Sequence, residues 1–215
     1  MSDLALREEL IRVGRQLAAQ NLNRGASGNI SVRCGEGLLI SPSGLGAEGL
    51  TPEDIVFVDA AGRAHGQRAP SSEWLFHRDI LAARPEFGAV VHTHSVAATT
   101  LACLRKEIPA IHYMILMAGG DNIPCTGYAT FGTQALSDLA VAALQERKAC
   151  LLANHGVIAA GKTLKEAARL AEEVEMLATL YLQALQIGEP VLLTREELQA
   201  ARQQFEALRY GEQGA

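Results

Sequence analysis

Short apolar runs of β type alternate with amphipathic segments of helical spacing along this chain of 215 residues. The first amphipathic segment, Leu4 to Ala19, places its apolar side chains mostly three or four residues apart, which predicts a helix with one face on a sheet. Between Gly28 and Gly66 the pattern changes to short β-type runs separated by glycine, proline and serine, as in a meander. Because helices and strands interleave, we expect a domain of the α/β or α+β class.

Further strands and helices are expected in the rest of the chain. Apolar runs predict strands at 89–91, 149–153 and 157–160, and amphipathic stretches predict helices at 71–83 and 133–145. In the last third, Thr163 with Glu166 and Thr194 with Glu197 have the spacing of capping boxes, at the start of a long helix and of a shorter final one. We find no internal repeat and no linker, so residues 1–215 are predicted to form one domain.

The charge balance and the cysteine spacing limit the class of protein. Asp and Glu number 24 against 19 Lys and Arg, and the net charge of -5 argues against a general nucleic-acid binder. No apolar run approaches the roughly 18 residues of a membrane span, and charged residues interrupt the first segment where a signal peptide would be apolar. The four cysteines form no CxxC pair. We therefore expect a soluble cytoplasmic protein with reduced thiols and no membrane partner.

Histidines follow two of the predicted strands and are candidates for a metal site. His92 and His94 follow an apolar run at i and i+2, so both side chains leave the same face of an extended chain and can converge on one ion. His155 also follows an apolar run and precedes Gly156, where the chain can turn sharply. Solvated or core histidines would give the same spacing. Three histidines leave one position open on a tetrahedral zinc ion, which is the pattern of a catalytic centre.

Three further segments contain candidate polar ligands. Glu73, in Pro70 to Trp74, is a carboxylate at a predicted helix start, where it can either complete a metal site or simply complement the helix dipole. The segments 25–29 and 41–44 combine glycine with hydroxyl or amide groups, which suits hydrogen bonds to a phosphate. Turns between strands would have the same composition, so the sequence leaves both interpretations open.

One motif imitates a nucleotide-binding loop. Residues 156–163 match the pattern G-x-x-x-x-G-K-[ST], and the apolar run 55–59 ends in Asp like the strand that often accompanies such a loop. However, the four middle residues are Val, Ile, Ala and Ala, which favour a buried strand. Thr163 is then the N-cap of the long helix, and Asp59 precedes the loop, in the reverse of the usual order. We therefore predict a strand and a helix cap here.

Taken together, the motifs resemble the class II aldolase/adducin-head family. The resemblance is carried by the segments 25–29, 41–44, 70–73, 92–94 and 154–156, and the segments 111–114 and 123–133 look most like its L-fuculose-1-phosphate aldolase branch. It extends over about residues 5 to 210. The resemblance implies a single α/β domain with a central, largely antiparallel sheet covered by helices. It also implies a homotetramer with active sites at subunit interfaces.

The resemblance also implies the roles of particular residues. His92, His94 and His155 would hold one zinc ion per subunit. Glu73 would be a fourth ligand in the empty enzyme and a proton shuttle once substrate displaces it. Tyr113, donated by a neighbouring subunit, would act on the aldehyde oxygen. The substrate phosphate would be held by Gly28, Asn29, Ser43, Gly44, Ser71 and Ser72.

The expected activity is that of a zinc-dependent aldolase, which cleaves a ketose 1-phosphate resembling L-fuculose 1-phosphate into dihydroxyacetone phosphate and an aldehyde. Zinc would stabilise the enediolate as a Lewis acid. A lysine Schiff base is not expected, because none of the four lysines lies in an apolar strand. Alternatives are an aldolase for 5-deoxy- or 5-methylthioribulose 1-phosphate, a sugar-phosphate dehydratase or decarboxylase, and a non-catalytic interaction module like the adducin head.

The chain departs from the aldolase pattern of the family at one position and leaves another open. Ala26 stands where the family usually has threonine, so one phosphate-binding hydroxyl is missing unless Ser27 replaces it. A tyrosine of the C-terminal tail contributes in fuculose-phosphate aldolases, and Tyr210 is the candidate for that position here. Phosphate affinity and the role of the tail are therefore the least determined parts of the expected site.

Overall fold

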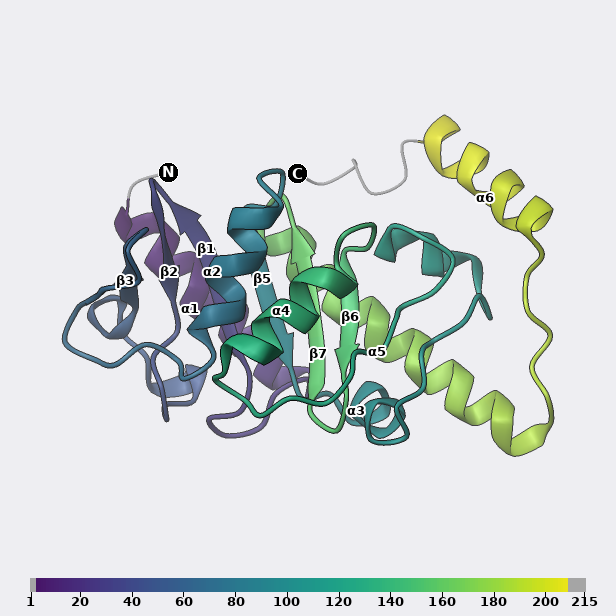
Figure 1. Ribbon diagram of the computed structural model, residues 1–215, viewed down its shortest axis with the longest axis horizontal. Helices are drawn as coiled ribbons and strands as arrows, with labels where there is room; N and C mark the ends of the chain where they lie inside the picture. Colours follow the sequence, from purple (N-terminus) through teal and green to yellow (C-terminus); the bar gives the residue numbers. More distant parts are fainter. Residues whose placement is uncertain (1–2, 209–215) are drawn as a thin grey trace.

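The computed structural model describes residues 3–208 and contains one seven-stranded sheet with helices on both faces (Figure 1). The strand order is β4-β3-β2-β1-β5-β7-β6, and all neighbouring strands are antiparallel. The strands are β1 (Asn29–Cys34), β2 (Gly37–Ile40), β3 (Val56–Val58), β4 (Ala64–His65), β5 (Ala89–Thr93), β6 (Ala149–Leu152) and β7 (Gly156–Gly161). The largely antiparallel sheet expected from the resemblance is confirmed.

Six α-helices and three short 3-10 helices connect the strands within residues 3–208. The α-helices are α1 (Asp3–Ala19), α2 (Trp74–Ala83), α3 (Val96–Cys103), α4 (Gln134–Ala143), α5 (Leu164–Ile187) and α6 (Arg195–Ala207). The 3-10 helices are η1 (Ala47–Gly49), η2 (Pro52–Asp54) and η3 (Tyr113–Ala118). Within these residues, no helix is both long enough and apolar enough to cross a bilayer.

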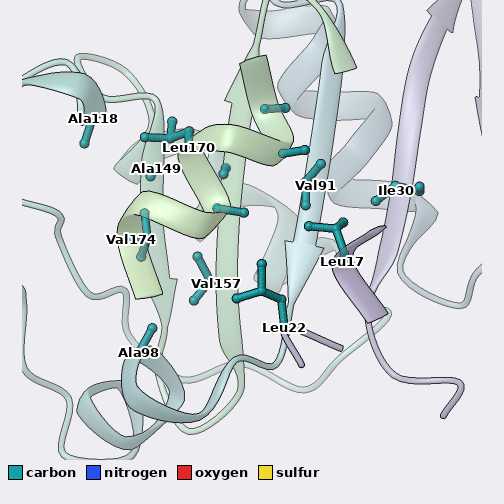
Figure 2. Close-up of a cluster of buried hydrophobic side chains, with 14 of the residues drawn as sticks. Leu17, Leu22, Ile30, Val91, Ala98, Ala118, Ala149, Val157, Leu170 and Val174 are labelled. Carbon is teal, nitrogen blue, oxygen red and sulfur yellow. The ribbon is translucent and has the colours of Figure 1, made fainter. Parts of the chain in front are cut away.

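The two faces of the sheet have separate hydrophobic cores. Helices α1, α3 and α5 cover one face, where Val91 and Val157 pack with side chains such as Leu17 and Val174 (Figure 2). Helices α2 and α4 cover the other face. Alternate residues of each central strand enter opposite cores because successive side chains of a strand point to opposite faces. The strand β5 is therefore buried on both sides, and any polar residue in it must find a partner inside the protein.

Most of the expected elements are present, with shifts at their ends. The helix expected at 71–83 begins at Trp74, and the short strand β4, the helix α3 and the three 3-10 helices were not predicted. The nucleotide-loop motif is a buried strand, β7, followed by the N-cap Thr163, whose hydroxyl accepts from the Glu166 N–H at 3.2 Å. The Glu166 carboxylate accepts instead from the Lys162 N–H, so the predicted capping box is only half formed. The capping box at the start of α6 is complete.

The last helix lies apart from the sheet. Figure 1 shows α6 joined to the end of α5 by an extended segment, at the edge of the molecule. It packs mainly on η3, and Leu198 is its buried residue. The four cysteines are all free, and Cys150 is the buried one among them.

Candidate metal centre

His92 lies within β5, where its neighbours in the sheet are Asn29 of β1 and Ile158 of β7. Its ring is fully buried and packs edge-on against Phe76 of α2, with the ring centroids 5.4 Å apart. The Nδ1 atom lies 2.8 Å from the carbonyl oxygen of Val157, so this nitrogen carries the proton and donates it. The Nε2 atom is therefore left with a lone pair that can bind a metal ion.

His94 and His155 bring two more imidazoles to the same place. The Nε2 atoms of His92 and His94 lie 2.9 Å apart, so the two rings converge as the i, i+2 spacing predicts. The ring centroid of His155 lies 4.8 Å from that of His92 and 5.1 Å from that of His94. His94 and His155 are 61 residues apart in the sequence. They meet at one end of two neighbouring inner strands, where β5 ends and β7 begins.

The residues on either side of His155 determine where its ring lies. Asn154 has a φ of +56°, in the left-handed region that asparagine tolerates better than most residues. Gly156 lies in β7, where an added Cβ would come within 2.5 Å of the Thr93 carbonyl oxygen and 2.9 Å of His94 Cδ2. The sharp turn expected at Gly156 is therefore made by Asn154. Glycine is needed at 156 because a side chain there would collide with the neighbouring strand and ring.

Glu73 completes the cluster. It occupies the N-cap position of α2, but its side chain makes no capping hydrogen bond. Its Oε2 atom lies 3.3 Å from His92 Nε2, and its Oε1 atom lies 3.1 Å from His155 Nε2. The Asn29 side-chain N–H donates to Oε2 at 2.8 Å. Complementing a helix dipole requires none of these contacts, so that role alone does not explain the orientation of the carboxylate.

Burial and neighbouring groups set the protonation states of the cluster. Burial lowers the pKa of His92 to about 3, and it also lowers the pKa of His94. Burial raises the pKa of Glu73, but His92, His155 and the Asn29 amide lower it by more, so the pKa of this carboxyl lies well below its usual range. Neutral imidazoles and an ionised carboxylate are the forms that bind a divalent cation.

The cluster fits a metal ion. The ligand atoms of Glu73, His92, His94 and His155 all lie within 4.8 Å of one another. Glu73 Oε1 is buried and accepts no hydrogen bond of normal geometry, which leaves it with the kind of unmet acceptor capacity that a cation satisfies. Imidazole nitrogen and carboxylate oxygen are ligands of zinc and of several other divalent transition metals. These four side chains can therefore hold one such ion.

A pocket with a volume of about 320 Å³ opens over this cluster. Its size lies at the lower end of the range typical of small-molecule sites. Tyr128 and Phe131 line it, and within residues 3–208 no lysine or arginine does. Residues predicted for the site that also line it are Gly28, Asn29, Ser43, Gly44, Ser71, Ser72, Glu73, His94 and His155. The structure thus brings the candidate phosphate loops and the cluster to one pocket, with His92 buried behind them.

Two polar side chains of this pocket are engaged within the protein. Asn29, a predicted phosphate ligand, directs its amide nitrogen to Glu73, and its Oδ1 atom lies 2.5 Å from His77 Nε2. The Ser27 hydroxyl donates its only hydrogen to the Arg24 carbonyl oxygen at 2.7 Å. In this conformation Ser27 has no hydrogen left to donate to a phosphate, so it does not replace the hydroxyl that is missing at position 26.

The candidate tyrosine Tyr113 lies outside the pocket of its own chain. Tyr113 begins η3, is 44% exposed and packs edge-on against Phe205 of α6, and it is not among the residues that line the pocket. A role at the pocket therefore requires Tyr113 of another copy of the chain. Tyr210 lies outside the described residues.

Two residues around the cluster were not identified from the sequence. Asn23 accepts the N–H of His94 with its Oδ1 atom at 3.1 Å, across 71 residues, and no motif marks it. His77 of α2 is fully buried beside Asn29. Its spacing of four residues from Glu73 is a signal that could have identified it, because residues four apart lie on the same side of a helix.

Comparison with known proteins identifies the family. The sequence model described as the class II aldolase and adducin N-terminal domain matches residues 8–182. A 5-methylthioribulose-1-phosphate/5-deoxyribulose-1-phosphate aldolase from Rhodospirillum rubrum is 56% identical, over 98% of this chain and 95% of the relative. An L-fuculose phosphate aldolase from Escherichia coli is 46% identical, over 93% of this chain and 94% of the relative.

A solved structure agrees with the sequence relatives. An L-fuculose 1-phosphate aldolase superposes with a TM-score of 0.90 at 40% identity, over 94% of this chain and 96% of the other. The chain belongs to the class II aldolase and adducin N-terminal domain family, and its aldolase relatives identify it as a metal-dependent lyase.

Proposed function

We propose that this protein is a zinc-dependent aldolase that reversibly cleaves a ketose 1-phosphate into dihydroxyacetone phosphate and an aldehyde. The observation that carries the proposal is one pocket lined by both a Glu/His cluster and two glycine- and serine-containing loops. The cluster supplies the ligands of a divalent cation, and the loops supply hydroxyl groups and backbone N–H groups for a phosphate.

Breaking the carbon–carbon bond leaves an electron pair on the carbon beside the ketose carbonyl. A zinc ion held by the three histidines supplies Lewis-acid stabilisation of this negative charge. That carbon must then gain a proton. Glu73, the carboxyl group at the cluster, would deliver it after the substrate has displaced the carboxylate from the metal and the carboxylate has taken up a proton. All four lysines are exposed and none lines the pocket, which agrees with a mechanism that uses no Schiff base.

The other end of the pocket suits the phosphate. Gly28 has a φ of +71°, and an added Cβ would collide with the Asn23 side chain, so only glycine fits this turn. Ser43 and Ser72 are exposed at the pocket, and Ser71 lies beneath them. Because no lysine or arginine of the described part of the chain lines the pocket, binding of a phosphate would depend on hydrogen bonds from these loops and on the metal ion.

Two aldehydes are candidates. The first is the aldehyde of L-fuculose 1-phosphate, which follows from the matched motifs and from the relative and solved structure named for that sugar. The second is the aldehyde of 5-deoxy- or 5-methylthioribulose 1-phosphate, favoured by the higher identity of the Rhodospirillum rubrum relative, 56% against 46%. The aromatic side chains of Tyr128 and Phe131 at the pocket also suit an aldehyde with an apolar end.

Tyr113 is proposed to reach the pocket from a neighbouring subunit of a homotetramer, where it exchanges a proton with the aldehyde oxygen. The exposure of Tyr113 and its absence from the pocket of its own chain support this arrangement. Mixing two inactive variants tests it. Mixed tetramers of Glu73→Gln and Tyr113→Phe subunits should regain activity, because some of their sites contain both native residues. Activity no higher than that of the separate variants would contradict a shared site.

A substrate panel tests the proposed function. Fuculose, rhamnulose, ribulose, 5-deoxyribulose and 5-methylthioribulose 1-phosphates would be assayed for release of dihydroxyacetone phosphate and aldehyde, before and after chelation and after addition of zinc. We expect cleavage of at least one substrate, its loss on chelation and its return with zinc. Absence of cleavage by the zinc-loaded protein, or full activity of the metal-free protein, would contradict the proposal.

A further inference from the structure

A chain of buried hydrogen bonds runs from β1 through α2 to the carboxylate of Glu73. Ser31 Oγ lies 2.7 Å from His77 Nδ1, and His77 Nε2 lies 2.5 Å from Asn29 Oδ1. The Asn29 amide nitrogen then donates to Glu73 Oε2 at 2.8 Å. Ser31 and His77 are fully buried, and Asn29 is 8% exposed. Bulk water therefore does not compete for the polar atoms in the middle of this chain.

The direction of each hydrogen bond follows from the acceptor at the end of the chain. An ionised carboxylate can only accept, so Asn29 must present its NH2 group to Glu73 and its carbonyl oxygen to His77. That oxygen can only accept, so His77 Nε2 must carry the ring proton. The Nδ1 atom then has only a lone pair, and Ser31 must donate its hydroxyl hydrogen to it. All donors of the chain therefore point toward Glu73.

The protonation state of His77 agrees with this direction. Burial lowers the pKa of His77 to about 3, so the ring carries a single proton at neutral pH. A neutral ring can donate from one nitrogen and accept at the other, as the two contacts require. The ring also stacks on Phe76, with centroids 4.7 Å apart, which limits its rotation. The packing and the hydrogen bonds therefore hold the same orientation.

The chain makes the two oxygens of Glu73 unequal. Oε2 accepts from Asn29, whereas Oε1 is buried, lies 3.1 Å from His155 Nε2 and accepts no hydrogen bond of normal geometry. Both oxygens lie near the cluster, since Oε2 is 3.3 Å from His92 Nε2. The Asn29 hydrogen bond occupies one lone pair of Oε2, whereas Oε1 keeps its full acceptor capacity for a metal ion or a proton. The difference between the two oxygens depends on the Asn29 amide keeping its orientation.

We propose that His77 is a positioning residue for Glu73, because it holds the Asn29 side-chain amide in one orientation. In this orientation Glu73 Oε2 accepts from Asn29, and Glu73 Oε1 is the oxygen that binds the metal ion and carries the proton. The part of this inference that concerns the proton rests on the proposed aldolase function. The part that concerns metal binding does not, because the orientation of a metal ligand affects affinity whatever the reaction. Ser31 supports His77 by fixing its tautomer.

Two substitutions at position 77 separate positioning from packing. His77→Phe keeps a ring against Phe76 but removes both nitrogens, whereas His77→Gln keeps an amide N–H for Asn29 Oδ1. Zinc affinity, measured by competition with a chromophoric chelator, should fall about 10- to 100-fold in His77→Phe and return close to the wild-type value in His77→Gln. In the aldolase assay, kcat should fall in His77→Phe with little change in KM. Ile80→Val, a buried change on the same helix, is the matched control.

A second pair of variants tests the far end of the chain and does not depend on whether His77→Phe folds. Ser31→Ala removes the donor to His77 Nδ1. Ser137→Ala is its control. Ser137 of α4 is an equally buried serine that lies outside the pocket and donates its hydroxyl hydrogen to Asp79 of α2. Zinc affinity should fall in Ser31→Ala by less than in His77→Phe, and it should not change in Ser137→Ala.

The results distinguish the positioning role from a structural one and from failure of the proposed function. Unchanged zinc affinity in folded His77→Phe, or an equal loss in His77→Gln or Ile80→Val, would overturn the inference. If His77→Phe does not fold, unchanged affinity in Ser31→Ala would overturn it. A wild-type protein that cleaves no ketose 1-phosphate would contradict the proposed function, while the affinity series would still decide whether His77 positions Glu73.

Discussion

The two ends of the pocket differ in how their polar groups are held. At the histidine end, His92 is fully buried, Glu73 is 7% exposed, and both are fixed by contacts with groups in neighbouring strands. At the loop end, Ser43, Gly44 and Ser72 are exposed in turns. At the histidine end, the side chains lose their conformational freedom when the protein folds. At the loop end, part of this loss would occur when the ligand binds.

This difference suggests a division of tasks. Groups that must act at fixed distances lie at the histidine end, where the sheet determines their positions. Groups that bind a phosphate lie in turns, which can adjust to the ligand. Substitutions at the histidine end should therefore change kcat and metal affinity, and substitutions at the loop end should change KM. The following predictions test this contrast, from the largest expected effect to the smallest.

The largest effect is expected for Glu73→Gln. The amide keeps the size of the side chain but can neither accept nor deliver the proton, so kcat should fall by about 10²- to 10⁴-fold with little change in KM. Steady-state kinetics with the preferred ketose 1-phosphate would measure both. Glu36→Gln, in the exposed turn between β1 and β2, is the control and should have wild-type kinetics. An unchanged kcat in Glu73→Gln would show that this carboxylate is not the proton-transfer group.

The next effect is expected for Gly156→Ala. The added Cβ would press on the Thr93 carbonyl and on the His94 ring, and relief of that overlap moves ligand atoms. Zinc affinity should fall about tenfold or more, and the free energy of unfolding should fall by about 1–3 kcal/mol. Gly49→Ala is the matched control, because an added Cβ there meets no atom within 4 Å. Equal zinc affinity in the two variants would show that the site tolerates the displacement.

A smaller effect is expected at the loop end for Ser43→Ala. Because Ser43 is exposed, loss of its hydrogen bond to a charged group should weaken binding by about 1.5 kcal/mol, the lower end of the usual range, so KM should rise about tenfold, with kcat and zinc affinity unchanged. Ser27→Ala sharpens the test, since the Ser27 hydroxyl donates to the Arg24 carbonyl and should contribute little to KM. A larger increase in KM for Ser27→Ala than for Ser43→Ala would reverse the assignment.

The last effect is spread over several pH units and concerns the acid stability of the metal-free protein. The pKa of His77 is about 3 in the folded chain, against about 6.5 for a histidine in an unfolded chain. Between these values the unfolded state binds a proton that the folded state does not, so the free energy of unfolding decreases as pH falls below about 6.5. Above that pH His77 contributes no such dependence.

Urea denaturation of the metal-free protein at several pH values would measure this dependence. His77→Gln removes the titrating ring, so its free energy of unfolding should fall less steeply with acid than that of the wild type. The comparison between the two proteins isolates His77 from the other histidines and from Glu73. If the free energy of unfolding has the same pH dependence in the two proteins, the pKa of His77 does not differ between the folded and unfolded states.

The sequence was informative where a local pattern places a side chain. Alternation in a strand put His92 and His94 on one face, and the apolar run before Asn154 put His155 at a strand end. The elements on either side were predicted for the same reason, since their apolar residues repeat at the periods of a strand or helix. The helix α3 was not predicted because its sequence, VAATTLAC, has no clear amphipathic period.

The remaining features depend on contacts between segments that are distant in the sequence. Asn23 and His94 are 71 residues apart, and Asn29 and His77 are 48 apart, so no local pattern links them. The need for glycine at 156 also depends on the neighbouring strand, whose carbonyl and histidine ring occupy the space of a side chain. Tyr113 illustrates the same limit between chains, because its proposed site lies on another subunit.

Zinc content is the measurement that tests the central claim most directly. Wild-type protein purified without chelators and dialysed against metal-free buffer should retain about one zinc per chain. His155→Ala should retain much less, while His65→Ala, an exposed histidine paired with Asp59, should match the wild type. Comparable zinc in all three proteins, or none in the wild type after zinc has been supplied, would contradict a metal centre built from Glu73 and the three histidines.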